Sequence, residues 1–122
     1  MESEYQYDPL SQGPNTILIV DDDEMNRAIL ENIFSSFYAV EEAENGREGL
    51  EKLTANQEKI CAVLLDVVMP EMDGLQVLHV LEQQGLLGKI PVFLITAEAS
   101  DTTMREAYEL GVMDVISKPV VP

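Results

Sequence analysis

The stretch between residues 60 and 70 constrains the fold more than any other part of the chain. Five mostly apolar residues, Cys61 to Leu65, lead directly into Asp66, and Pro70 follows four positions later. A short, continuously apolar run is typical of a strand that is buried on both faces of a sheet. Because proline cannot donate a ladder hydrogen bond, the strand must end before Pro70. Asp66 is therefore expected at the carboxyl end of a buried strand, where open parallel sheets bind ligands.

Strands and helices are predicted to alternate along the rest of the chain. Apolar or alternating runs predict four further strands, at residues 16–20, 38–43, 92–96 and 114–118. Helical spacing of apolar residues and capping signals predict helices over about residues 24–37, 47–54, 75–84 and 101–110. The first helix should bury a stripe formed by Ala28, Ile29, Ile33, Phe34 and Phe37. This order predicts an α/β domain with a parallel sheet and helices on both faces.

Length and charge narrow the class of protein. The 122 residues, 46% of them hydrophobic, suit one domain with one core. A net charge of -16, from 7 basic and 23 acidic residues, argues against nucleic-acid binding by this segment and against docking on an anionic membrane. This balance favours a domain that holds cations or meets basic partner surfaces.

The N-terminal residues and the single cysteine bear on location. Residues 1–15 are polar and acidic, with Pro9, Gly13 and Pro14, and are interpreted as a tail or linker before a domain at residues 16–122. They lack the basic and apolar regions of a signal peptide, and no apolar run reaches the length of a membrane span. Cys61 is alone, so no intrachain disulfide can form, and a reducing, cytoplasmic location is expected.

Polar residues occur where several of the predicted strands end. The first strand is followed by Asp21 and Asp22, the third ends in Asp66, the fourth ends in Thr96, and the last carries Lys118. Parallel strands place all of these residues at one edge of the sheet. Neighbouring carboxylates repel one another, and a divalent cation relieves the repulsion. An all-oxygen ligand set without His or Cys suits Mg²⁺, or Mn²⁺, rather than Zn²⁺.

The same residue types can support phosphoryl transfer. A carboxylate is a competent nucleophile toward phosphorus and forms an acyl phosphate. Transfer needs neutralisation of charge and positioning, which Mg²⁺ and Lys118 can supply, while the Thr96 hydroxyl can donate a hydrogen bond to a phosphate oxygen.

In these motifs the chain resembles the receiver domains of two-component response regulators. The matching segments are Ile19-Val20-Asp21-Asp22, Leu65-Asp66-Val67-Val68-Met69-Pro70, Met72-Asp73-Gly74, Ile95-Thr96-Ala97 and Ser117-Lys118-Pro119. The resemblance covers about residues 16–120. It implies a flavodoxin-like, doubly wound, five-stranded parallel sheet of order 2-1-3-4-5.

The resemblance also implies a role for each site residue. Asp66 would be the phosphoacceptor, with Thr96 as the switch hydroxyl and Lys118 as the phosphate partner. Asp22 would ligate Mg²⁺ directly and Asp21 would lie nearby or act through water. Asp66 and the Val68 backbone carbonyl would complete the protein ligands. The phosphoryl donor would be a phosphohistidine of a sensor histidine kinase or phosphotransfer protein, and the domain would be a signalling switch rather than an enzyme.

Some positions depart from the family pattern. Val115 stands where the family often has an aromatic residue that swings inward with the switch threonine, and Val120 stands where Phe often follows Lys-Pro. The sequence ends at Pro122, before the family's fifth helix, which predicts a fragment of a longer protein with an output domain. Asn26-Arg27 and residues 120–122 resemble receivers fused to cyclic-dinucleotide output domains. Apolar surface left without the final helix would favour a homodimer.

Two other functions remain open at this point. A Mg²⁺-dependent aspartyl-phosphate phosphohydrolase usually carries a second Asp two residues after the nucleophile, whereas this chain has Val68 there. A phosphorylation-independent docking domain would keep the fold without needing Asp21, Asp22, Asp66, Thr96 and Lys118, which are all present.

Overall fold

Five strands alternate with four helices in the structure, a computed structural model that describes residues 13–97 and 100–120. In chain order the elements are β1 (Thr16–Val20), α1 (Glu24–Phe34), β2 (Ala39–Ala43), α2 (Gly46–Ala55), β3 (Ile60–Asp66), α3 (Gly74–Gln83), β4 (Val92–Thr96), α4 (Asp101–Leu110) and β5 (Asp114–Ser117). The predicted sequence of elements is therefore confirmed. The expectation of an N-terminal tail falls mostly on residues 1–12, which lie outside the described residues.

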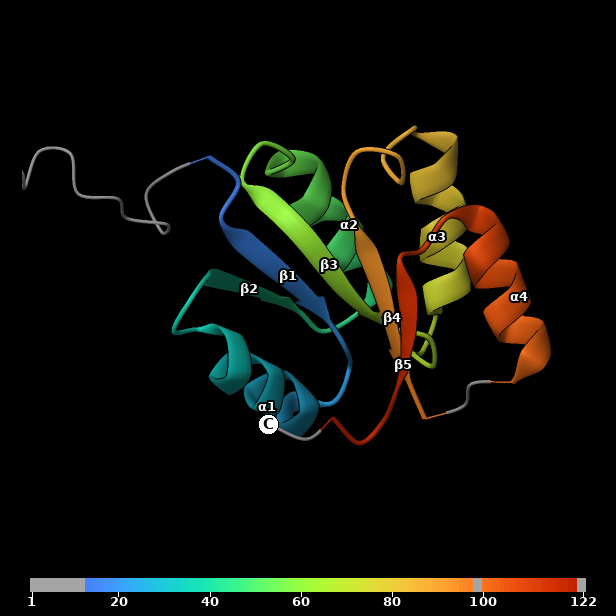
Figure 1. Cartoon of the computed structure of the whole chain (residues 1–122), viewed down its shortest axis with the longest axis horizontal. Helices are drawn as coiled ribbons and strands as arrows, with labels where there is room; N and C mark the ends of the chain where they lie inside the picture. Colours follow the sequence, from blue (N-terminus) through green and yellow to red (C-terminus); the bar gives the residue numbers. More distant parts are fainter. Residues whose placement is uncertain (1–12, 98–99, 121–122) are drawn as a thin grey trace, which may run out of the picture.

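The strands form one parallel sheet of order β2-β1-β3-β4-β5 (Figure 1). This is the flavodoxin-like order, with the first strand between the second and third. The register pairs Val20 with Leu65, Asp66 with Ile95, and Thr96 with Ser117. The ends of the strands that carry polar residues therefore lie side by side, and the predicted convergence at one edge follows directly from this register.

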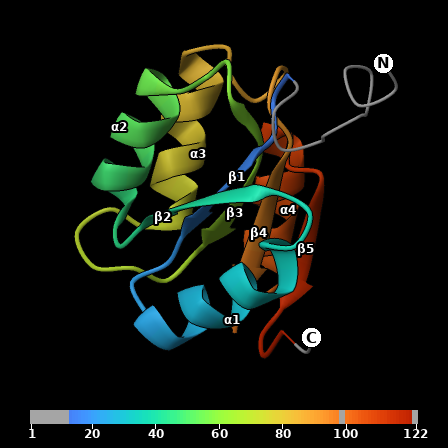
Figure 2. The same ribbon diagram turned by 90° about the vertical axis from the view of Figure 1, so that its left-hand side faces the viewer.

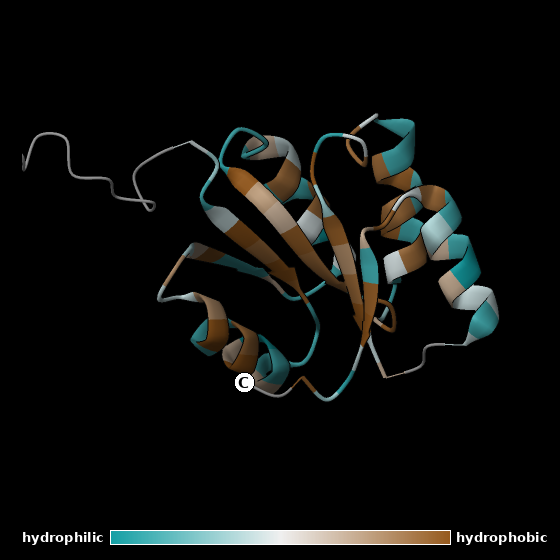
Figure 3. Ribbon diagram, in the orientation of Figure 1, coloured by the Kyte–Doolittle hydropathy of each residue, from teal (hydrophilic) through white to brown (hydrophobic). Residues whose placement is uncertain are grey.

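The sheet separates a large core from a small one. On one face, α2, α3 and α4 pack against the sheet, and 18 buried residues form a continuous cluster that includes Leu18, Leu65 and Leu94. On the other face only α1 is present among the described helices, and the cluster has five buried residues: Ile17, Ile19, Leu30, Leu64 and Ile95. Figure 2 shows α2 and α3 on one side of the sheet and α1 on the other. The central strands are apolar on both faces (Figure 3).

The predicted boundary and buried stripe of α1 were partly wrong. The helix ends at Phe34 rather than at residue 37, and the Ser35 N–H donates to the Glu31 carbonyl at its end. Phe37 is 67% exposed and Ala28 is exposed, whereas Leu30, which was absent from the predicted stripe, is the fully buried residue of this helix. The reason is tertiary, because among the described helices α1 alone covers this face, and only its side nearest β1 and β3 is buried.

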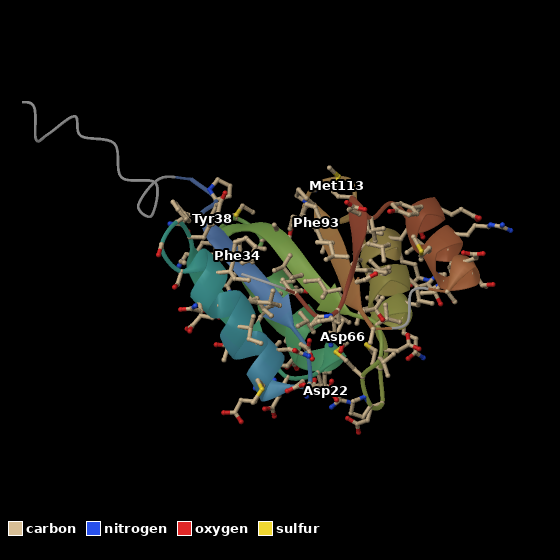
Figure 4. The ribbon with its side chains drawn as sticks, turned by 60° about the horizontal axis from the view of Figure 1, so that its bottom comes forward. Asp22, Phe34, Tyr38, Asp66, Phe93 and Met113 are labelled. Carbon is tan, nitrogen blue, oxygen red and sulfur yellow. The ribbon has the colours of Figure 1, made fainter. Side chains whose placement is uncertain are left out.

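An open apolar groove lies on the face that carries α1. It has a volume of about 480 Å³, and uncharged residues line it, among them Phe34, Tyr38, Cys61, Phe93 and Met113. Figure 4 shows Phe34 and Tyr38 on one side and Phe93 and Met113 on the other. The groove is a candidate surface for the expected homodimer, which stays a prediction. In the described residues no helix has the length and apolar character needed to cross a bilayer.

Candidate functional site

The carboxyl edge of the sheet brings the predicted site residues together from four strands. Asp21 and Asp22 follow β1, Asp66 is the last residue of β3, Thr96 is the last of β4, and Lys118 follows β5. Figure 4 shows Asp22 and Asp66 near one another at this end of the sheet. Asp21, Asp66 and Thr96 are buried, whereas Asp22 is exposed. The edge thus presents an exposed carboxylate beside two buried ones.

Lys118 joins the two buried carboxylates. Its Nζ lies 3.1 Å from Asp66 Oδ2 and 3.1 Å from Asp21 Oδ2, so one ammonium group donates to both. The Lys118 backbone N–H donates to the Thr96 carbonyl at 2.9 Å, which anchors this segment to the end of β4. The peptide bond between Lys118 and Pro119 is cis. A single lysine cannot fully neutralise three carboxylates, and the edge keeps a negative balance.

The pKa values of Asp66 and Lys118 both move upward. Burial raises the pKa of Asp66 above its ordinary 3.8, against the lowering effect of the hydrogen bond from Lys118, and repulsion from Asp21 raises it further. Burial by itself would lower the pKa of Lys118, but its hydrogen bonds to Asp21 and Asp66 outweigh that effect and raise it. The lysine is therefore held in its charged form, and Asp66 is a more basic carboxylate than an exposed aspartate.

The three carboxylates have the spacing of a metal site. One oxygen from each of Asp21, Asp22 and Asp66 lies within 4.8 Å of the others. Oxygen donors at this spacing fit a hard divalent cation of the Mg²⁺ or Mn²⁺ type, which takes one or two carboxylates and keeps several waters. The exposed position of Asp22 leaves that side open to water or to a phosphate.

The loop after β3 frames Asp66. The Val68 N–H points to Asp66 Oδ1 over a long distance of 3.4 Å, and the Val68 side chain is 57% exposed. Gly74 closes the loop, since its N–H donates to the Val67 carbonyl at 2.8 Å. A Cβ atom at Gly74 would lie 2.4 Å from the Asp66 carbonyl oxygen and 2.8 Å from Val67 Cα. Only glycine allows α3 to begin this close to the backbone of Asp66.

Two contributors to the site were absent from the predicted set. Gly74 was noted within the Met72-Asp73-Gly74 motif, but its steric role depends on a backbone approach that a sequence does not display. Arg27 was noted only as part of the Asn26-Arg27 pair, yet its guanidinium donates to the Asp21 carbonyl. The available signal was a lone basic residue shortly after the acidic run Asp21-Asp22-Asp23-Glu24.

Comparison with known proteins places the chain in a family. The model of the response regulator receiver domain matches residues 17–122, so the chain belongs to the receiver domain family of two-component systems. Receiver domains are signalling domains. A solved structure described as a complex of CheX, CheY, BeF3 and Mg²⁺ from Borrelia burgdorferi is similar with a TM-score of 0.80 and 29% identity, over 88% of this chain and 81% of that one.

Similar curated proteins are multidomain regulators. One, from Vibrio cholerae, is named a probable cyclic di-GMP phosphodiesterase and is 37% identical over 105 residues, which cover 86% of this chain and 23% of that protein. Another, the transcriptional regulatory protein SrrA of Staphylococcus aureus, is 36% identical over 109 residues, which cover 88% of this chain and 43% of SrrA. The chain thus spans less than half the length of these relatives.

Proposed function

We propose that this domain is a phosphoacceptor switch in which Asp66 takes a phosphoryl group from a phosphohistidine of a sensor histidine kinase or phosphotransfer protein. The observation that carries the proposal is the arrangement of Asp66, with Lys118 Nζ 3.1 Å from Oδ2 and two further carboxylates beside it. Thr96 ends the neighbouring strand. Such a cluster suits a reaction whose main demands are positioning and neutralisation of charge.

The metal in this proposal is Mg²⁺, with Mn²⁺ as a substitute. Asp21, Asp22, Asp66 and the Val68 backbone carbonyl would hold it, and their all-oxygen donor set fits such an ion. When bound, Mg²⁺ supplies positive charge that offsets the phosphate oxygens and the carboxylates. The similar CheY complex from Borrelia burgdorferi, which is described as containing Mg²⁺, supports this assignment by analogy.

The side chains of this chain would then act as follows. An Asp66 carboxylate oxygen attacks phosphorus, the bond from phosphorus to the imidazole nitrogen of the donor breaks, and the imidazole takes up a proton. Lys118 exchanges part of its interaction with Asp66 for one with the transferred phosphoryl group. The Thr96 hydroxyl donates to a phosphate oxygen. The acyl phosphate carries about -1.5 to -2 charge, enough to draw both groups toward it.

These movements would bias two arrangements of the face formed by α4 and β5. A shift from about 1:99 to 99:1 requires roughly 5.5 kcal/mol of differential interaction, which several charge-assisted hydrogen bonds can supply. The partner surface would lie along residues 98–108 and 112–116. Within the described part of that range, Tyr108 of α4 is an exposed aromatic side chain, whereas the exposed Met113 and Ile116 line the groove on the side of α1.

The wider setting is part of the same proposal. Residues 1–15 would form an N-terminal tail or linker. Residues 16–122 would form the receiver unit of a longer regulator. The Vibrio cholerae relative supports an output connected with cyclic dinucleotides. The single cysteine suits a reducing cytoplasm.

Phosphorylation by a small acyl-phosphate donor tests this function. With Mg²⁺ and acetyl phosphate, wild type should gain the mass of one phosphoryl group and Asp66→Asn should gain none. Asp73→Asn is the matched control, since it alters an aspartate in the adjoining loop and Asn caps a helix as well as Asp does. Equal labelling of wild type and Asp66→Asn would refute the proposal.

Two rival functions have distinct signatures. Multiple turnover of an external phosphomonoester would indicate a phosphohydrolase, although Val68 offers no general acid at the position such enzymes use. A failure to bind millimolar Mg²⁺, together with no phosphorylation, would indicate a docking domain that retains only the fold.

A further inference from the structure

Arg27 lies behind the turn that presents the first two aspartates. It belongs to α1, and its side chain is only 12% exposed. Its Nη1 donates to the Asp21 carbonyl oxygen at 2.6 Å and its Nε donates to Glu42 Oε1 at 3.1 Å. One guanidinium thus joins α1, the end of β1 and β2.

The turn is held at each polar group of Asp21. The Asp21 N–H donates to the Ala43 carbonyl at 3.0 Å, and the Asp23 N–H donates to Asp21 Oδ1 at 2.9 Å. Arg27 takes the remaining backbone group, the carbonyl that leads directly into Asp22. The backbone from which the exposed Asp22 carboxylate projects is therefore fixed from behind.

Glu42 controls the direction of the guanidinium. A cation next to three carboxylates is attracted toward them and would compete there with a divalent ion. Glu42 accepts from Nε and so keeps Arg27 on the rear of the turn. Glu42 is itself located by β2, and Lys52 Nζ donates to its backbone carbonyl. Among the described residues, Lys118 is the cation that contacts the buried carboxylates directly.

We propose that Arg27, held in place by Glu42, is a positioning residue that sets the affinity of the acidic edge for Mg²⁺. The inference rests on the proposed metal site. The proposal predicts that removal of Arg27 weakens Mg²⁺ binding, whereas electrostatics alone would predict tighter binding. Removal of a positive charge near three carboxylates should by itself strengthen cation binding, whereas loss of the support behind Asp21 and Asp22 should weaken it.

Mg²⁺ titrations followed through the backbone amide signals of residues 21–23 separate the two effects. Arg27→Gln should weaken Mg²⁺ binding by about tenfold, the lower end of the range for residues that orient metal ligands. Arg27→Lys should lie between wild type and Arg27→Gln, because an ammonium can reach one acceptor but not both. Glu42→Gln should weaken binding by about threefold, since the neutral amide oxygen can still accept from Nε but no longer holds the guanidinium by charge.

Arg47→Gln is the matched control. Arg47 is exposed at the start of α2, beside Pro70 and Glu71 of the loop after β3, and its replacement removes the same charge near the same edge. Its affinity for Mg²⁺ should equal or slightly exceed that of wild type. Unfolding by urea in EDTA gives the stability of each variant separately from its metal affinity.

These measurements distinguish failure of the Arg27 inference from failure of the proposed function. Wild-type affinity or tighter binding in Arg27→Gln, with or without a loss of stability, would overturn the inference while leaving phosphorylation at Asp66 untouched. If wild type itself failed to bind Mg²⁺ and to accept a phosphoryl group, both this inference and the proposed function would fall. If Arg27→Gln does not fold, unchanged affinity in both Arg27→Lys and Glu42→Gln would overturn the inference.

Discussion

On one side of the carboxylate cluster the β1–α1 turn is bonded to two neighbouring elements, whereas on the other side β5 forms an edge of the sheet. All five residues of β1 are buried, and Asp21 is tied to β2, to α1 and to Asp23. Three of the four residues of β5 are exposed, and Val115 is half-buried. One side of the site is held by several hydrogen bonds, and the other side is more exposed and has fewer buried residues.

In the proposed switch, this difference would separate metal binding on one side of the site from the conformational response on the other. A cation site binds best when its protein ligands are already held in place, because immobilising a mobile side chain on binding costs free energy. A switch needs an element whose alternative arrangements are close in free energy, and such elements come from weakly packed regions. Lys118 connects the sides, because it follows β5 yet contacts Asp21 and Asp66.

The largest expected contrast is between Asp22→Ala and Thr96→Ala. Loss of the exposed carboxylate should weaken Mg²⁺ binding by roughly 10- to 100-fold. Loss of the Thr96 hydroxyl should leave Mg²⁺ affinity within about twofold, because this buried hydroxyl at the end of β4 is proposed to bind a phosphate oxygen and is not a proposed metal ligand. Calorimetric titration with Mg²⁺ measures the affinity of both variants. Similar losses of affinity in Asp22→Ala and Thr96→Ala would contradict the proposed difference between the two sides of the site.

Lys118→Met tests the connection between the sides. Removal of one partner from a buried ion pair is strongly destabilising, and because Lys118 retains 17% exposure we expect a loss of about 1–3 kcal/mol in EDTA. Mg²⁺ should then stabilise the variant more than wild type, since it relieves the unpaired Asp21 and Asp66. Urea unfolding with EDTA and with Mg²⁺ gives both quantities. An equal effect of Mg²⁺ on the two proteins would contradict a shared charge balance.

The pH dependence of metal-free stability should carry the signature of Asp66. Because its pKa is raised in the folded protein, its contribution to stability is complete below the ordinary value of 3.8 and is lost as pH rises through the raised folded value. Asp66→Asn should therefore gain stability over wild type as pH rises from about 4 to 8 in EDTA. Urea midpoints across this range measure the gap, and saturating Mg²⁺ should close or reverse it. If the urea midpoint of Asp66→Asn instead fell relative to that of wild type as pH rises, the pKa of Asp66 would be lowered in the folded protein.

The smallest effect should come from Val68→Asn. Val68 is exposed beside Asp66 and cannot orient an attacking water, so a polar side chain there should hasten loss of the acyl phosphate by about threefold to tenfold. Its affinity for Mg²⁺ should stay at the wild-type value, because only the backbone carbonyl is a proposed ligand. Decay of phosphoprotein measured by mass spectrometry gives the rate. A variant with an unchanged lifetime would show that water access is set elsewhere.

Local sequence predicted the elements well and their tertiary surroundings less well. The strand at residues 60–66 and the helix at residues 101–110 match the structure, because each is bounded by strong local signals. The end of α1 was misjudged since Phe37 continues a helical pattern that the chain does not follow. The exposed positions of Phe37 and Met113 depend on which helices cover which face, a property of the assembled domain.

The sequence by itself determined the alternating order, the parallel sheet and the meeting of Asp21, Asp22, Asp66, Thr96 and Lys118 at one edge. These follow from chain polarity, because parallel strands end on the same side whatever their exact packing. Only the tertiary structure decided that Lys118 joins Asp21 to Asp66, that Gly74 is required behind Asp66, and that Arg27 supports the turn of Asp21. Such contacts join residues as far apart as positions 21 and 118, and strand register and helix packing set their distances.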